Sequence, residues 1–110
     1  AFTMRAVDSI VKYIEGQGMT QEEAAAVVGC SRQALWDKLN KGSSRFHKML
    51  PIFSAFGFDL NIVHEDGSPA ELDIEKFTAA ASGDRNMYFD DLENVIAAMG
   101  YRFELVKKAE

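Results

Sequence analysis

Apolar residues recur three and four positions apart along much of the chain, which is the spacing of amphipathic helices. Two segments, 58–64 and 101–107, instead alternate apolar and polar residues, which predicts half-buried strands. We therefore expect a mainly α fold: a helix-turn-helix bundle with two short β-strands that form a small antiparallel ribbon. The expected helices cover residues 4–15, 21–28, 32–41, 45–56 and 73–81, with one more beginning at residue 89.

The stretch 20–42 carries the clearest local signals. Thr20 and Glu23 have the spacing of a capping box, which starts a helix. Gly29 suits the left-handed conformation that ends a helix, and Ser31 is a favourable cap for the next one. Two short helices joined by such a turn form a helix-turn-helix, whose second helix can enter a DNA major groove.

The second helix of this motif has an inner and an outer face. Leu35 and Leu39 are four positions apart, so they share the face that points back at the preceding helix. Arg32, Gln33 and Asp37 are left on the outer face.

An internal repeat relates the two expected strands. Residues 46–63 and 89–106 match at a constant offset, and each copy reads as an amphipathic helix, a glycine and a short strand. We predict two units: a helix-turn-helix domain over 1–64, and an acidic partial repeat over 65–110 that serves dimerisation or partner binding. Before the second copy, residues 70–75 also alternate like a strand, but a helix from about residue 73 is favoured.

A strand left alone presents an unpaired edge, so the two predicted strands are expected to pair with each other. The pattern leaves open whether they pair within one chain or across a homodimer. The residues assigned to dimerisation are Phe58, Leu60, Ile62, Tyr101, Phe103 and Leu105.

Charge is distributed unevenly. The chain has a net charge of −5, yet residues 31–58 hold five basic side chains and one acidic one. Residues 59–110 hold five basic and twelve acidic side chains. A local positive excess beside the second helix of the motif favours phosphate contacts, and the acidic half opposes indiscriminate DNA binding.

Other classes of protein are disfavoured. A single cysteine, Cys30, excludes an internal disulfide and fits a reducing cytoplasm. No apolar run approaches the roughly 18 residues that span a bilayer, so we expect no membrane association. His47 and His64 are isolated, and no catalytic, metal or cofactor motif is present. We expect a cytoplasmic protein that is not an enzyme and has no metal or cofactor.

The segments TQEEAAAVVGCSRQALWDKLNKG and RFHKMLPIFSAFGFDLNIV resemble the lambda-repressor-like (Cro/CI or XRE) helix-turn-helix family of phage repressors and antitoxins, over residues 4–64. The resemblance implies that Arg32 and Gln33 read base edges, with Trp36 and Asp37 on the next outward turn. Arginine matches guanine and glutamine matches adenine through bidentate hydrogen bonds, whereas an aspartate can only accept hydrogen bonds and is matched to the N4 amino group of cytosine. The residues implied to contact phosphate are Gln21, Lys38, Lys41, Ser43, Ser44 and Arg45.

Two functions follow from these observations. The first is a sequence-specific transcriptional regulator that binds double-stranded DNA as a homodimer, with the helix 32–41 in the major groove. The alternative is a protein-interaction module, such as an antitoxin, an anti-repressor or a phage inhibitor. In that case the helix-turn-helix is mainly scaffold and the acidic half binds a protein partner.

Overall fold

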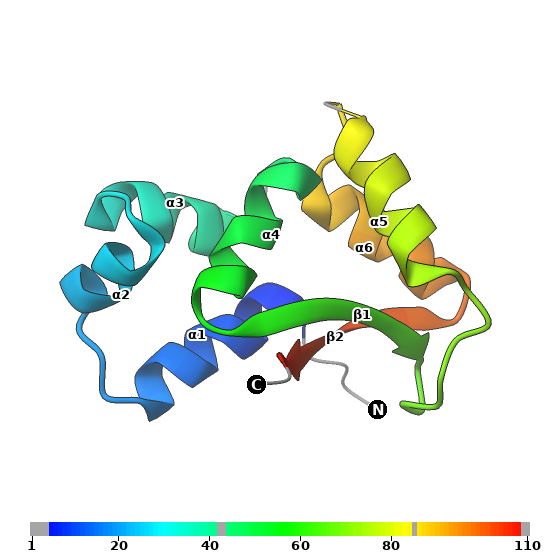
Figure 1. Cartoon of the computed structure of the whole chain (residues 1–110), viewed down its shortest axis with the longest axis horizontal. Coiled ribbons are helices and arrows are strands. Elements are labelled where there is room, and N and C mark those ends of the chain that lie inside the picture. The colour runs from blue at the N-terminus through cyan, green and yellow to red at the C-terminus, as the bar shows by residue number, and fades with distance from the viewer. Residues whose placement is uncertain (1–4, 42–43, 85, 109–110) are drawn as a thin grey trace.

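Helices dominate the fold, and a two-stranded antiparallel sheet lies along one side of them (Figure 1). The computed structural model describes residues 5–41, 44–84 and 86–108. Within these residues the expected fold class, mainly helical with a two-stranded antiparallel ribbon, is confirmed. The elements in chain order are α1 (Ala6–Gly16), α2 (Gln21–Val28), α3 (Arg32–Lys41), α4 (Phe46–Ala55), β1 (Phe58–His64), α5 (Ile74–Gly83), α6 (Phe89–Ala98) and β2 (Tyr101–Lys107).

Local capping explains where α2 and α3 begin and end. The Thr20 hydroxyl accepts a hydrogen bond from the Glu23 backbone N–H at 3.1 Å, and the Glu23 carboxylate accepts one from the Thr20 N–H at 3.0 Å. Gly29 ends α2 with φ of 89°, a conformation that costs other residues about 1–2 kcal/mol. The Ser31 hydroxyl accepts from the Ala34 N–H at 3.1 Å and starts α3. The capping box, the glycine stop and the serine cap are therefore confirmed.

The internal repeat is visible in the element boundaries. α4 and α6 each have ten residues, β1 and β2 each have seven, and both strands and both helices start 43 positions apart. Gly57 and Gly100, which join helix to strand, have φ of 85° and 88°. The two copies of the repeat thus have the same local structure.

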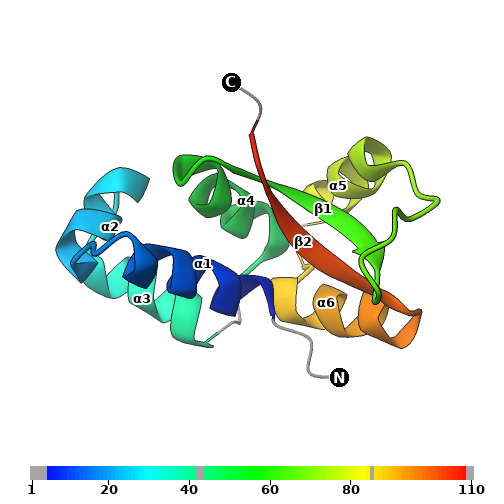
Figure 2. The ribbon, with the colours of Figure 1, turned by 90° about the horizontal axis from the view of Figure 1, so that it is seen from below.

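The two copies are also related by an approximate two-fold axis. In the sheet, Asn61 lies opposite Glu104, its own counterpart in the repeat, and the pairing is symmetric about this position. Seen from the ribbon side, α4 and α6 lie on opposite sides of the paired strands (Figure 2). Of the two arrangements left open by the sequence, the structure has the strands paired within one chain.

Backbone hydrogen bonds across this axis replace side-chain caps. The Phe46 N–H donates to the Met87 carbonyl and the Phe89 N–H donates to the Ser44 carbonyl, both at 2.8 Å. Neither α4 nor α6 has a side-chain cap. Ser44 has the chemistry of a helix cap but does not cap α4. The N-cap residue is Arg45, and the first donors of both helices are satisfied by the other copy.

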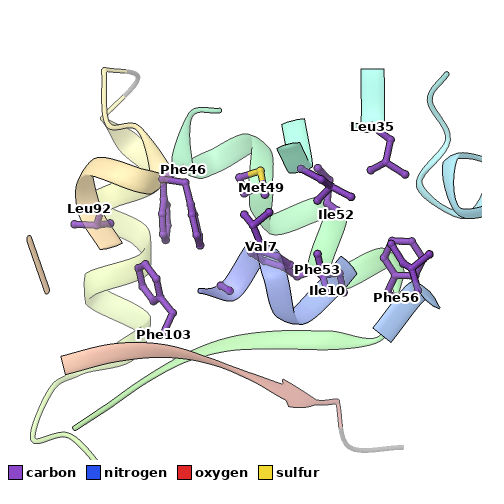
Figure 3. Close-up of a cluster of buried hydrophobic side chains, with 14 of the residues drawn as sticks. Val7, Ile10, Leu35, Phe46, Met49, Ile52, Phe53, Phe56, Leu92 and Phe103 are labelled. Carbon is purple, nitrogen blue, oxygen red and sulfur yellow. The ribbon is translucent and has the colours of Figure 1, made fainter. Parts of the chain in front are cut away.

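One hydrophobic core joins the two copies. The rings of Phe46 and Phe89 stack with their centroids 5.7 Å apart, and Phe89 stacks on Phe103 at 5.0 Å. The same core includes Ile10 of α1 and Leu35 of α3 (Figure 3). Residues on both sides of position 64 therefore fold around shared side chains.

The segment before α6 is a helix preceded by an extended piece, as favoured from the sequence. The Asp73 carboxylate accepts from the Lys76 N–H at 3.1 Å and starts α5. Ahead of it, Pro69 forms an isolated bridge with Val63. The strand alternative for residues 70–75 is wrong, because Asp73 caps a helix whose Ile74 packs against the core.

Candidate nucleic-acid interface

The two faces of α3 separate as the leucine spacing predicted. Leu35 is 0% exposed and Leu39 is 3% exposed, so both belong to the core. Arg32, Gln33 and Asp37 are exposed. Three polar side chains of different hydrogen-bonding capacity therefore lie on the outward face of a short helix, where groups outside the molecule can reach them.

The Arg32 side chain is held by the start of α2. Its Nη1 donates to Gln21 Oε1 at 3.1 Å, and its Nε lies 3.6 Å from Glu22 Oε1. The Arg32 and Glu22 side chains are 58% and 72% exposed, so this ion pair contributes little to stability. Its effect is on position: two residues expected to contact DNA, Gln21 and Arg32, touch each other across the turn.

Two further residues of α3 are only partly exposed. Trp36 is half-buried and packs against the core, and Lys38 is half-buried as well. Cys30, in the turn before α3, is also half-buried and packs against the core. Trp36 thus helps to anchor α3 while part of its ring stays accessible beside the outward face.

The connection from α3 to α4 carries the remaining residues assigned to phosphate. Ser44 is half-buried and its carbonyl accepts from α6, while Arg45 is exposed. The Arg45 guanidinium lies 5.9 Å from the centre of the Tyr88 ring, a cation–π contact that the sequence did not indicate. The Lys41 side chain and Ser43 lie outside the described residues.

The residues assigned to dimerisation lie against the core of their own chain. Ile62 and Phe103 are buried, and the other four are half-buried. They stand at alternate positions, so they share the face of the ribbon that meets the helices. The half-buried residues pack against the same core, and they are Phe58, Leu60, Tyr101 and Leu105.

An ionic clamp that sequence reasoning missed ties α1 to α6. Arg5 forms ion pairs with Asp90 and Glu93, and the Ala6 N–H donates to Glu93 Oε2 at 3.1 Å. Burial raises the pKa of Asp90 above its usual range, and the Arg5 charge offsets part of this effect. The clamp joins positions more than eighty residues apart, which no local pattern indicates.

A groove lies away from α3. This open groove of about 880 Å³ runs between α4, β1 and α5, with Leu50, Phe58 and Ile74 among its lining residues. His47 and Glu75 are among its polar positions. Over the part of the chain that the structure describes, no three His, Cys, Asp or Glu side chains are grouped as metal ligands would be.

No family model, no curated protein and no solved structure matches the chain. Membership of the lambda-repressor-like family therefore stays a prediction from the motif. None of the helices in residues 5–41, 44–84 and 86–108 has the length and apolar character to cross a bilayer.

Proposed function

We propose that the protein is a sequence-specific DNA-binding regulator that reads its site with the outward face of α3. The observation that carries the proposal is the placement of Arg32 and Gln33 on the exposed first turn of α3, with Gln21 beside Arg32. The positive excess of residues 31–58 supports it, because phosphate contacts supply much of the affinity of such proteins.

In this proposal the N-terminal turn of α3 enters the major groove. Arg32 binds the O6 and N7 atoms of a guanine, and Gln33 binds the N6 and N7 atoms of an adenine. Arg32 gives up its contact with Glu22 when it does so, and the released Glu22 carboxylate stays exposed to water. Asp37, one turn further on, can accept a hydrogen bond from the amino group of cytosine or adenine but is repelled by the acceptor atoms of guanine and thymine, so it narrows the choice of site.

The mode of assembly is part of the proposal. Each described chain presents one α3, so a two-fold site needs two chains with their α3 helices about 34 Å apart. The ribbon residues assigned to dimerisation pack against the core of their own chain, so the proposed dimer uses other contacts in addition to or in place of these side chains.

The test is a binding measurement on DNA from upstream of the protein's own gene and on a randomised duplex library. Arg32→Ala with Gln33→Ala should weaken binding to the selected sequence by roughly 1–3 kcal/mol per lost base contact and relax its sequence preference. Lys76→Ala, which removes an exposed positive charge from α5, is the control and should leave sequence preference intact. Unchanged specificity in the double variant would refute the assignment of α3 as the reading helix.

The second candidate function is a protein-interaction module in which α2 and α3 are scaffold. The observations that favour it are the acidic half of the chain and the contact between Arg32 and Glu22, which occupies the arginine. A salt titration separates the two functions, because phosphate-driven binding falls steeply with salt concentration. Absence of DNA binding even at low salt would favour the interaction module.

A further inference from the structure

Two equivalent helix faces of the repeat have different surroundings. On α4, Ile52 is 1% exposed and Phe56 is 6% exposed. Their counterparts, 43 positions later, are Val95 at the end of α6 and Met99 just beyond it, and these are 55% and 64% exposed. The same positions of the same unit are therefore buried in one copy and open to solvent in the other.

Helices of the N-terminal unit cover the α4 side. α2 packs against α4, and the Tyr13 ring of α1 meets Phe56 edge-on with the centroids 6.3 Å apart. Ile52 lies in the same buried cluster as Leu35 of α3 (Figure 3). A repeat unit of this kind thus buries this side under amphipathic helices.

No described element covers the corresponding side of α6. The helix that precedes α6 in the chain is α5, and it packs on α4, where Ile74 and Thr78 line the groove beside Leu50. Tyr88, at the start of α6, is 39% exposed and extends the apolar surface. We call Tyr88, Val95 and Met99 the α6 face.

We propose that the α6 face binds an amphipathic helix of a partner protein, one with basic residues beside its apolar stripe. The shape argument is the equivalence with α4, whose corresponding side is covered by helices. The charge argument concerns the part of the face near Val95, where Asp91 is exposed one turn earlier, within a half of the chain that holds twelve acidic and five basic residues. The positive charge of Arg45 lies at the Tyr88 ring, at the start of α6.

A second copy of the chain fits this surface less well than a basic helix. Two α6 faces packed against each other would each bring an Asp91 carboxylate to the contact, and like charges there oppose association. Opposite charge on the partner removes this penalty. Val95 and Met99 are not among the residues assigned to base or phosphate contacts, so variants at these two positions test the α6 face separately from DNA binding. Tyr88 contacts Arg45, which is assigned to phosphate, and is therefore left unchanged in the variants.

The probe is a synthetic peptide of about 15 residues, the length at which isolated helices begin to be stable, with leucines three and four positions apart and lysines flanking them. A peptide of the same composition with scrambled leucine positions is the control. Titration followed by NMR should shift the signals of Tyr88, Val95 and Met99, and the scrambled peptide should leave them in place. No shift at these residues, or equal binding of the scrambled peptide, overturns the proposal.

Variants test the same surface. Val95→Ser with Met99→Ser should weaken peptide binding about tenfold or more, whereas Val27→Ser, at a valine of α2 that is 43% exposed, should leave it unchanged. Equal effects of the two changes would refute the proposal. The last experiment is sedimentation of the chain without peptide. If the chain is a dimer and the double change Val95→Ser with Met99→Ser dissociates it, the α6 face serves self-association and the proposal is refuted.

Discussion

Phe46 and Phe89 occupy equivalent positions on either side of the approximate two-fold axis, and their stacked rings offer the sharpest test of the shared core. They are 0% and 1% exposed, with their planes 13° apart. Because each ring packs into the other copy of the repeat, Phe46→Ala and Phe89→Ala should each destabilise the whole chain, and by similar amounts.

The magnitude follows from burial and stacking. Truncating a buried phenylalanine to alanine costs about 3–5 kcal/mol. This cost approaches the total stability of roughly 5–15 kcal/mol expected for a small domain. Leucine variants, which lose less, stay folded enough for their free energy of unfolding to be measured. Phe46→Leu and Phe89→Leu should each cost about 1–2 kcal/mol. The double variant should cost less than the two singles together, by about 0.5–1.5 kcal/mol, because the stack is lost only once.

The assay is urea unfolding followed in parallel by far-UV circular dichroism and by Trp36 fluorescence. A single transition seen by both probes is expected for every variant, because Trp36 packs against the same core. Leu35→Ala, at a buried residue of α3, is the control for coupling, and its cost should add to that of Phe89→Leu. Additive costs for the phenylalanine pair, or a Phe89→Leu variant in which the two probes report separate transitions, would refute the reasoning.

Three further predictions concern caps and turns. Thr20→Ala should lower the free energy of unfolding by about 0.5–2 kcal/mol in thermal or urea denaturation, because it removes one half of the capping box. Hydrogen bonds from the Thr20 N–H and hydroxyl lower the pKa of Glu23 below its usual 4.5, so its stabilising effect is present above that pH and is lost as the pH falls through the folded-state pKa. Glu23→Gln should therefore reduce the decrease in the free energy of unfolding as the pH is lowered. An identical decrease in the variant and the original chain would contradict this. Gly57→Ala and Gly100→Ala should each cost about 1–2 kcal/mol for the positive φ alone, since no atom stands within 4 Å of the added methyl group, and unequal urea midpoints would argue against equivalent turns.

Much of the fold could be predicted because its signals are local. The two strands were expected at residues 58–64 and 101–107, and they lie there. Each begins after a glycine and alternates in polarity, and neither signal depends on distant residues. The boundaries of α2 and α3 were predictable for the same reason, since Thr20 and Ser31 bond to backbone groups three positions away.

What was missed depends on distant residues. Ser44 has the chemistry of a cap, but the first donor of α4 finds the Met87 carbonyl instead, a partner set by the packing of the two repeats. For the candidate site, helical spacing predicted the outward position of Arg32. It did not predict the contact with Glu22, because that contact requires the crossing geometry of α2 and α3.

The offset of 43 positions between the stacked rings also means that the two halves of the shared core are synthesised at different times. When Phe46 leaves the ribosome, the residue that will cover its ring has not yet been made. At about 5–20 residues per second the interval is roughly 2–9 s. Throughout it, the apolar side of α4 that faces the second repeat has no partner in the chain. A nascent chain that stops before Phe89 would keep that side exposed and become a substrate for chaperones and proteases.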